Sequence, residues 1–311
     1  MTEDKNGFLQ KLEVPKGRVD VVLDTDAHAE IDDQFAIAYM LASKEKLDPK
    51  AIYAAPYSHK GSIPPWEAME LSYGEIKKVQ SLMGEDIPTF RGSEHYLPDE
   101  HTPVVSAAAL DLAKRVDSYS SESPLYVVAI GAITNVASAI LLNPKMTENA
   151  VVVWLGGHAH HYARVEEYNL RQDVAAARVV FSSGIPLVQL PCMGVVSSFA
   201  ASRPELEGWF IGKSAIADYL SKITIDYIEK HAHGPACEKV IWDVTAVAWL
   251  LNDGERFLES RLIEAPLPLE GGGYESVPGN HMMRYVYHVK RDALMNDLIE
   301  KLTKSQHPKN G

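Results

Sequence analysis

The chain has 311 residues, of which 46% are hydrophobic, and this length suffices for one large α/β domain or two smaller ones. It carries 42 acidic and 30 basic residues, and the formal net charge of -12 opposes binding to nucleic acid or to an anionic membrane surface. The sequence contains neither a run of about 18 apolar residues nor an apolar segment typical of a signal peptide. Its two cysteines, Cys192 and Cys237, are too few for a disulfide framework. We therefore expect a soluble, cytoplasmic protein in which residues 1–311 form a single domain.

Strand-like and helix-like patterns alternate along the first two thirds of the chain. Residues 19–23 form a β-branched run, and residues 32–43 follow it with apolar side chains at helical spacing. The later predicted strands are residues 51–56, 87–92, 125–131, 150–157 and 185–191. The later predicted helices are residues 64–84, 104–116, 134–142 and 173–183. Strands that are apolar throughout are typical of a parallel sheet covered by helices on both faces.

After about residue 200 the pattern becomes mainly helical. We expect helices over residues 217–231, 240–252 and 292–302. A glycine- and proline-rich stretch, residues 266–280, precedes residues 283–291, which we expect to be one arm of a late β-hairpin. The sequence thus predicts an open, mostly parallel, doubly wound (Rossmann-like) α/β sheet with a C-terminal helical and hairpin elaboration.

Four aspartates follow the first predicted strand in the segment VVLDTDAHAEIDDQF, residues 21–35. Asp24 and Asp26 lie where the strand ends, which is the edge where open α/β sheets bind ligands. Asp32 and Asp33 lie in the first turn of the next helix, where they could simply cap it and complement its dipole. Four like charges at one strand end destabilise a fold unless a cation neutralises them. Oxygen ligands favour Ca²⁺ or Mg²⁺ over Zn²⁺.

The order Asp-Thr-Asp, short loop, Ile-Asp-Asp resembles the DTDPGxDD signature of the inosine-uridine-preferring nucleoside hydrolases. Three later segments match the family in order. GAITNVASAI (131–140) is similar to its Gly-x-Leu-Thr-Asn motif, and EYNLRQDVAAA (167–177) to its Glu-Phe-Asn-x-x-x-Asp-Pro-Glu-Ala-Ala motif. WDVTAVA (242–248) is similar to its His- or Trp-Asp motif. The resemblance implies Ca²⁺-dependent hydrolysis of the N-glycosidic bond of ribonucleosides to ribose and free base, by a homodimer or homotetramer.

The resemblance also implies which residues would bind the ion. Asp26, Asp33 and Asp243 would coordinate Ca²⁺ through their side chains, and Thr134 would do so through its backbone carbonyl. Ca²⁺ would hold the ribose diol and lower the pKa of its bound water, so that Asp26 could remove a proton as general base.

The same resemblance assigns the sugar-binding residues. Asp32 would bind the ribose 2′ and 3′ hydroxyls or position the attacking water, and Glu167 and Asn169 would bind ribose hydroxyls. Asp24 would be a supporting carboxylate behind the site. A vicinal diol needs several acceptors fixed at once, and these side chains supply them. Carboxylates would also stabilise the positively charged, oxocarbenium-like ribosyl group of the transition state.

Several of these residues have a plainer structural interpretation. Thr134 and Asn135 lie at a strand-to-helix junction and could form an ordinary helix cap. Glu167 and Asn169 could be loop residues. Asp243 lies in an apolar helical segment, where an ionised carboxylate is costly unless it is paired, so we expect it to have a partner.

The loop between the second and third aspartates departs from the family signature. Here it is Ala27-His28-Ala29-Glu30-Ile31, two residues longer than usual. The longer loop brings His28 and Glu30 close to the predicted site. Glu30 would be either a capping residue or an additional acceptor for the ion or the substrate.

Trp242 stands where many family members have a histidine that acts as a general acid. The resemblance to purine-preferring members implies that Trp242 would stack against the base, which favours purine nucleosides as substrates. Trp66 or Tyr57 could supply a second ring. Alternatively, Trp242 and Trp249 are one heptad apart and could both be core residues.

A histidine-rich segment, GGHAHHYARVEEYN (156–169), precedes the predicted sugar-binding asparagine. Counting without gaps places His161 where family members carry an asparagine that reaches the ribose 5′ hydroxyl. The histidines could instead bind a transition metal or belong to a solvated lid. Because the asparagine is missing, the substrate could be a 5′-modified riboside.

Two other functional classes share parts of this sequence pattern. A haloacid-dehalogenase-type phosphatase also begins with Asp-x-Asp after its first strand, but it needs threonine or valine where this chain has His28. A non-catalytic, Ca²⁺-dependent ribosyl- or sugar-binding protein of the same fold is the stronger alternative, because the loop insertion and the missing histidine both fall in the catalytic apparatus. Release of reducing sugar from nucleosides would separate enzyme from binding protein.

Overall fold

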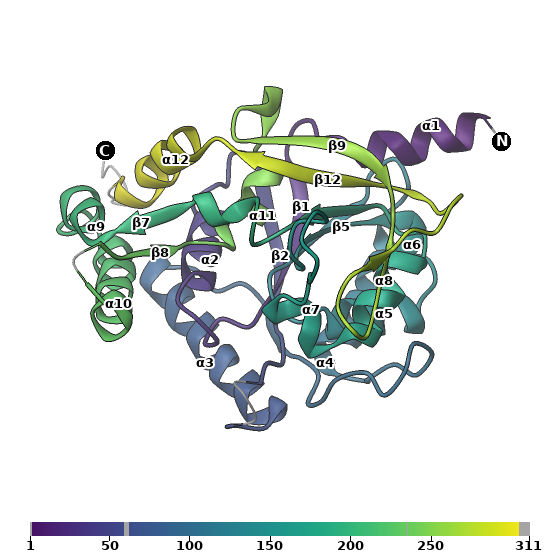
Figure 1. The fold of residues 1–311 in the computed structure, drawn as a ribbon, viewed down its shortest axis with the longest axis horizontal. Helices are drawn as coiled ribbons and strands as arrows, with labels where there is room; N and C mark the ends of the chain where they lie inside the picture. Colours follow the sequence, from purple (N-terminus) through teal and green to yellow (C-terminus); the bar gives the residue numbers. More distant parts are fainter. Residues whose placement is uncertain (1, 59–61, 235, 305–311) are drawn as a thin grey trace.

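The computed structural model describes residues 2–58, 62–234 and 236–304, which form an α/β fold around one eight-stranded sheet (Figure 1). Its strands lie in the order β3-β2-β1-β4-β5-β6-β12-β9. Neighbouring strands are parallel except β12 and β9, which are antiparallel. The bounds are β1 Val19–Thr25, β2 Leu47–Ala54, β3 Thr89–Arg91, β4 Leu125–Ala129, β5 Ala150–Leu155, β6 Leu187–Leu190, β9 Leu258–Glu264 and β12 Met282–Val289. The predicted open, mostly parallel sheet is therefore confirmed.

Helices cover both faces of the sheet, and alternate strand residues contact the two layers. In β4, Val128 packs in one core cluster and Val127 in the other. The first cluster includes residues of α2 (Asp33–Leu41), α3 (Pro65–Met83), α10 (Ala215–His231), α11 (Val244–Leu250) and α12 (Arg291–Thr303). The second includes residues of α4 (Ala107–Arg115), α5 (Thr134–Leu142), α6 (Met146–Asn149) and α8 (Val174–Ser182). Burial on both faces explains why the strand sequences are continuously apolar.

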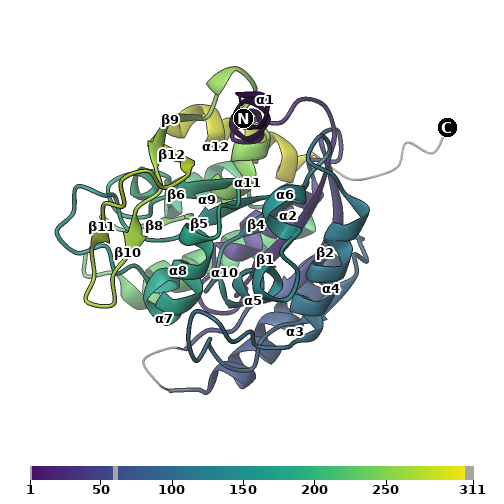
Figure 2. The same cartoon turned by 90° about the vertical axis from the view of Figure 1, so that its right-hand side faces the viewer.

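The remaining elements lie around this layered core. They are α1 Thr2–Lys11, α7 Tyr168–Gln172, α9 Arg203–Trp209, β7 Ala200–Ser202, β8 Glu238–Val240, β10 Leu267–Pro268 and β11 Tyr274–Glu275, with short 3₁₀ helices at Val116–Ser118, Val196–Ser198 and Asp253–Glu255. Figure 1 shows α9, α10 and the antiparallel pair β7–β8 at one end of the molecule, with α5, α6 and α8 at the other. Figure 2 shows the β10–β11 pair near α8, on the side opposite α4. Within the described ranges, we find no helix with the length and apolar character needed to cross a membrane.

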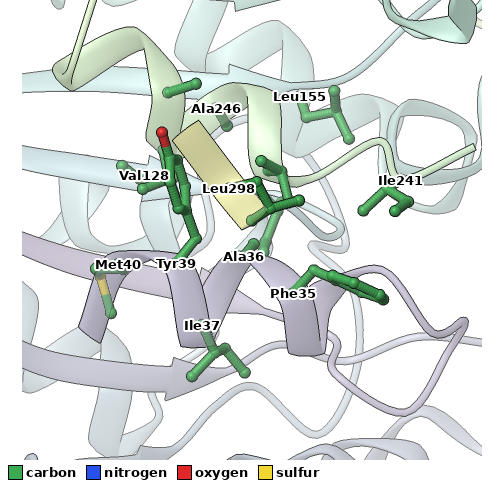
Figure 3. Close-up of a cluster of buried hydrophobic side chains, with 14 of the residues drawn as sticks. Phe35, Ala36, Ile37, Tyr39, Met40, Val128, Leu155, Ile241, Ala246 and Leu298 are labelled. Atoms are coloured by element: carbon green, nitrogen blue, oxygen red, sulfur yellow. The ribbon is translucent and has the colours of Figure 1, made fainter. Parts of the chain in front are cut away.

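Helix α2 is buried along its whole length, since all nine of its residues are classed as buried. Figure 3 shows its side chains among residues from β4, β5, α11 and α12, with Phe35 near one end and Met40 near the other. Phe35 also makes an edge-to-face contact with Phe210, with ring centroids 6.3 Å apart. The helix begins with Asp33, directly after Asp32, so tight packing of α2 fixes where both carboxylates lie.

Most predicted elements are present with small shifts in their bounds. The helix predicted over residues 134–142 is α5 with the same bounds. The segment 240–252 is more complex, because Val240 ends strand β8 and α11 begins only at Val244. The late strand, predicted as one arm of a hairpin, pairs with β9 as expected and also joins the main sheet parallel to β6.

Truncating Phe35 should test how strongly the core holds α2. We expect Phe35→Ala to lower the free energy of unfolding by about 3–5 kcal/mol, because it removes a fully buried aromatic ring. Urea denaturation would measure the loss. Leu110→Ala, at a side chain that is 51% exposed, is the control and should change the free energy by about 0.5 kcal/mol or less. Equal losses of unfolding free energy in the two variants would contradict a stabilising role for the buried Phe35 ring.

Candidate active site

The strand order reverses between β1 and β4, because the chain moves outward from β1 through β2 to β3 and then returns to β4 on the other side. Such a switch point is where open α/β sheets bind ligands. A cavity of about 150 Å³ lies beyond the carboxyl ends of these strands. It is lined by the carboxylates Asp26, Glu30, Asp32, Asp33, Glu167 and Asp243. The other lining residues are Ala29, Ile130, Leu155, His158, Tyr168, Asn169, Cys192, Met193 and Trp242.

Three of these carboxylates could hold a metal ion together. Asp32, Asp33 and Asp243 each offer an oxygen within 4.8 Å of the others, and all three side chains are buried. Asp32 and Asp243 stand at the N-cap positions of α2 and α11, yet neither makes a side-chain cap hydrogen bond. Helix capping therefore does not explain them, whereas a shared cation would offset their repulsion.

Asp26 directly follows β1 and lines the same cavity, although it lies outside this three-carboxylate cluster. Its side chain is 2% exposed, and its Oδ2 atom is a buried acceptor without a hydrogen-bond partner in the described structure. A Cβ atom on Gly131, which follows β4, would lie 3.1 Å from the Asp26 carboxylate, so glycine permits the close approach. A buried carboxylate oxygen without a partner, in the same cavity as the three clustered carboxylates, completes a set of oxygen ligands that suits a hard cation.

Burial raises the pKa of four aspartates at or behind the cavity, Asp24, Asp26, Asp33 and Asp243. It raises the pKa of Asp33 to about 7, with a further contribution from the charge of Asp32. It also holds the pKa of Asp26 and Asp243 well above the usual range, where neighbouring aspartates add to the effect. Asp24 has its pKa raised by burial to about 7, despite the opposing hydrogen bond from Asn135. Without a cation, part of the cluster stays protonated at neutral pH.

Asp24 lies behind the cavity, within β1. Its Oδ1 atom accepts a hydrogen bond of 2.8 Å from Asn135 Nδ2. Asn135 Oδ1 in turn accepts hydrogen bonds from the backbone and the hydroxyl of Ser93, at 2.8 and 2.9 Å. This chain of contacts links β1 to α5 and fits the supporting position expected for Asp24.

Thr134 lies at the start of α5 and is not among the residues that line the cavity. Its hydroxyl donates to Asp173 Oδ2 at 2.7 Å. No side chain caps the start of α5, so Thr134 does not act as the helix cap that the sequence allowed. The neighbouring residue that does line the cavity is Ile130, whose carbonyl accepts a hydrogen bond of 3.2 Å from Asn169 Nδ2.

Glu167 and Asn169 are fixed by backbone contacts. Glu167 caps α7, and its carboxylate accepts hydrogen bonds from the backbone nitrogens of Asn169, Leu170 and Gly157 at 2.8 to 3.1 Å. Asn169 Nδ2 donates to the carbonyls of Ile130 and Leu155, which leaves its amide oxygen as the acceptor for the cavity. Both side chains are 6% exposed, so they are held rigidly at the wall of the cavity.

Trp249, within α11, and Trp242, just before it, have different surroundings. Trp249 is fully buried in the core, whereas Trp242 is partly buried, lines the cavity and donates its backbone N–H to Asp32 Oδ2 at 3.1 Å. Trp66 and Tyr57 are the two rings that could stack on the base opposite Trp242. Trp66 is 52% exposed and lies outside the cavity lining. Tyr57 also lies outside it and bonds to His28 Nδ1. Tyr168 is the second aromatic ring in the lining.

The histidines of the 156–169 segment point in different directions. His158 lines the cavity, and its Nδ1 atom accepts a hydrogen bond from the backbone of Met193 at 3.3 Å. His160 lies between the rings of Tyr274 and Tyr285. His161 is exposed and does not line the cavity. These side chains do not form a shared metal site within the part of the chain that the structure describes.

Sequence reasoning missed Lys239, which carries a buried positive charge into the acidic site. Its side chain is 4% exposed, and its Nζ atom lies 2.5 Å from Glu30 Oε2 and 3.3 Å from Asp32 Oδ1. Glu30 is thus paired with a lysine and does not cap a helix. No motif marks a lone lysine in the alternating segment EKVIWD, 209 residues away from Glu30.

The raised pKa values of Asp24 and Asp33 predict how stability depends on pH. Their folded pKa of about 7 lies above the usual 3.8, so their stabilising contribution is complete below about pH 4 and is lost as the pH rises through about 7. We expect the melting temperature of the metal-free protein to fall over this interval. Added Ca²⁺ should raise it more at about pH 8 than at about pH 5, because it binds ionised carboxylates.

Thermal melts with a chelator and with Ca²⁺ would measure both effects. A Ca²⁺-induced shift of the same size at both pH values would contradict the expectation.

Comparison with known proteins agrees with this geometry. The sequence model of the inosine-uridine preferring nucleoside hydrolase family matches residues 21–290. The pyrimidine-specific ribonucleoside hydrolase RihB of Shigella flexneri serotype 5b is 29% identical over 142 residues, which are 43% of this chain and 44% of that protein. The non-specific ribonucleoside hydrolase RihC of Salmonella agona is 27% identical over 248 residues, 75% of this chain and 78% of that protein.

The fold is shared with a solved structure. A plant nucleoside hydrolase, the PpNRh1 enzyme, superposes with a TM-score of 0.73 at 20% sequence identity, covering 94% of this chain and 100% of that one. The match to the family model extends over most of the chain and includes every carboxylate of the cavity. The chain belongs to the inosine-uridine preferring nucleoside hydrolase family.

Proposed function

We propose that this protein hydrolyses the N-glycosidic bond of ribonucleosides in a Ca²⁺-dependent reaction that yields ribose and the free base. The observation that carries the proposal is the convergence of six carboxylates on one cavity at the switch point of the sheet. The names of RihB and RihC as ribonucleoside hydrolases support the substrate class.

The cation would be held by carboxylates from separate parts of the chain. Asp26, Asp33 and Asp243 would be the side-chain ligands. Asp33 and Asp243 belong to the buried cluster whose oxygens lie within 4.8 Å of one another, and Asp26 contributes a buried Oδ2 atom without a hydrogen-bond partner among the described residues. The backbone ligand would be the carbonyl of Ile130, which borders the cavity, in place of Thr134. Ca²⁺ fits a set made entirely of oxygen atoms.

Asp26 would act as the general base. When bound, the cation would hold the ribose diol and acidify the attacking water. Asp26 Oδ2 lacks another hydrogen-bond partner, and the pKa of the side chain is raised by burial and by Asp33 and Asp32. A carboxylate oxygen that has no other donor is placed to accept the proton of that water.

Asp32, Glu167 and Asn169 would bind the ribose hydroxyls. Each is oriented before substrate arrives: Asp32 by Lys239 and the backbone of Trp242, and the other two by backbone groups. Acceptors fixed in this way need little reorganisation as positive charge develops on the ribosyl ring, so they stabilise the transition state.

Trp242 and Tyr168 would contact the base. Both line the cavity, and a stacked purine would gain more contact area on Trp242 than a pyrimidine. His161 lies outside the lining, so His158 is the histidine of that segment that we assign to substrate contact.

A Ca²⁺-dependent ribosyl-binding protein without catalytic activity is the second candidate. Trp242 favours this candidate, because the family resemblance implies a histidine general acid at this position and indole cannot act as one. Reducing-sugar release from inosine, adenosine, uridine, cytidine and 5′-modified ribosides would separate the two functions. Calorimetric binding of ribosides without any release would favour the binding protein.

Removing a cation ligand should abolish both cation binding and hydrolysis. We expect Asp26→Ala and Asp33→Ala each to weaken Ca²⁺ binding on the order of 100-fold or more, measured by calorimetric titration, and to stop sugar release. Asp226→Asn, at an exposed surface aspartate, is the control and should leave both unchanged. Unchanged Ca²⁺ affinity in Asp33→Ala would disprove the ligand assignment.

Removing the indole ring should separate purine from pyrimidine substrates. We expect Trp242→Ala to lower kcat/KM for inosine about tenfold more than for uridine, because stacking on a base contributes about 1–3 kcal/mol. Trp66→Ala, an exposed tryptophan outside the cavity, should alter neither. Equal losses for both nucleosides would instead show that Trp242 acts by packing.

A further inference from the structure

Lys239 is enclosed by groups that neutralise its charge. The side chain is 4% exposed, and its ammonium group contacts Glu30 at 2.5 Å and Asp32 at 3.3 Å. The ring of Tyr227 lies on another side, 5.3 Å from Nζ to the ring centroid. A buried ammonium group is costly unless it is paired. Breaking either ion pair would therefore be unfavourable, and the lysine restrains the positions of both carboxylates.

Glu30 belongs to the segment Ala27–Ile31, which is longer than in the DTDPGxDD signature. Ala29 and Glu30 line the carboxylate cavity on one side. The same two residues line a second groove of about 490 Å³ on the other side, together with Tyr219 and Tyr227. Part of the segment thus borders both the carboxylate cavity and this groove. Its long-range anchor at Glu30 is the ion pair with Lys239.

Asp32 receives one donor on each oxygen. Lys239 contacts Oδ1, and the backbone N–H of Trp242, three residues further along the chain, contacts Oδ2. Removing Lys239 would leave the carboxylate with one donor, so that it could rotate and would lose the charge that faces it. The orientation of Asp32 therefore depends on a lysine whose own position depends on Glu30.

We propose that Lys239 is a positioning residue for ribose binding, and that Glu30 acts through it. Glu30 fixes the ammonium group of Lys239, and Lys239 fixes Asp32 toward the ribose hydroxyls. The extra length of the 27–31 segment delivers the Glu30 carboxylate to this place. The inference rests on the proposed function, since it assigns a partner to the Asp32 carboxylate of the same site.

The chain offers a matched control in a second buried lysine. Lys46 is 8% exposed, and its Nζ atom lies 2.6 Å from the more exposed Asp253. Lys46 lies just before the amino end of β2, whereas the cavity lies beyond the carboxyl ends of the strands. Lys46→Met and Asp253→Asn therefore break the same kind of ion pair without touching the site.

We expect Glu30→Gln to raise KM for a cleaved riboside about tenfold and to lower kcat as well, since the Asp32 carboxylate that it helps to orient both binds the ribose hydroxyls and stabilises the charge that develops on the ring. Lys239→Met should raise KM further. The double variant should be no worse than Lys239→Met, because Glu30 acts through the lysine. Lys239→Arg should restore part of the affinity. Lys46→Met and Asp253→Asn should lower the melting temperature and leave KM unchanged.

Hydrogen exchange supplies a readout that is independent of activity. The amides of residues 27–31 should exchange faster in Glu30→Gln and Lys239→Met than in the parent chain, and at the parent rate in Lys46→Met. If both site variants keep the parent KM and the parent exchange rates, Lys239 has a merely structural role and the proposal is overturned.

Failure of the proposed function would look different. A parent chain that neither binds nor cleaves ribosides would refute the proposed function and, with it, the ribose-positioning part of the inference. Faster exchange of residues 27–31 in Glu30→Gln would still support the anchoring of the segment by Lys239. Additive effects of Glu30→Gln and Lys239→Met on KM would overturn the claim that one acts through the other.

Discussion

The crowding of buried carboxylates at one strand end is the constraint on which the rest of the site depends. Asp26, Asp33 and Asp243 come from three separate parts of the chain, and each is only 2–3% exposed, so little solvent reaches their charge. Such a group persists only when something opposes its repulsion, which protons do partly at low pH and which the proposed divalent cation would do at neutral pH. The sheet, the buried helix α2 and the start of α11 bring these side chains together, so the fold stores an unfavourable interaction that ligand binding relieves.

Rigid support around the carboxylates allows this arrangement to exist. Asp24 is linked through Asn135 to the chain after β3, and the Thr25 hydroxyl donates to Asp33 at 2.5 Å. Glu167 is held by three backbone N–H groups. Because these contacts come from the backbone or from buried side chains, the acceptors are oriented without a ligand. The fold thus provides the preorganised acceptors that the proposed hydrolysis would require.

The sequence was enough to predict features that depend on neighbouring residues. The parallel sheet, the bounds of α5 and the acidic cluster follow from short periodic runs and a compact motif. Contacts between distant segments could not be predicted. The Glu30–Lys239 pair joins residues 209 positions apart, and counting along a motif placed Thr134 and His161 at a cavity that Ile130 and His158 line instead. The strands β7 and β8 are three residues long and too short for a periodic signal.

The insertion of β12 between β6 and β9 has a consequence for how the chain is made. Strand β6 ends at Leu190, but its outer neighbour begins only at Met282, so a growing chain carries β6 as an unpaired edge while about 90 further residues are synthesised. An apolar parallel edge of this kind is a template for pairing with other chains. The strand β12 therefore covers this edge long after β6 has been made, and any event that delays its pairing leaves β6 exposed to aggregation.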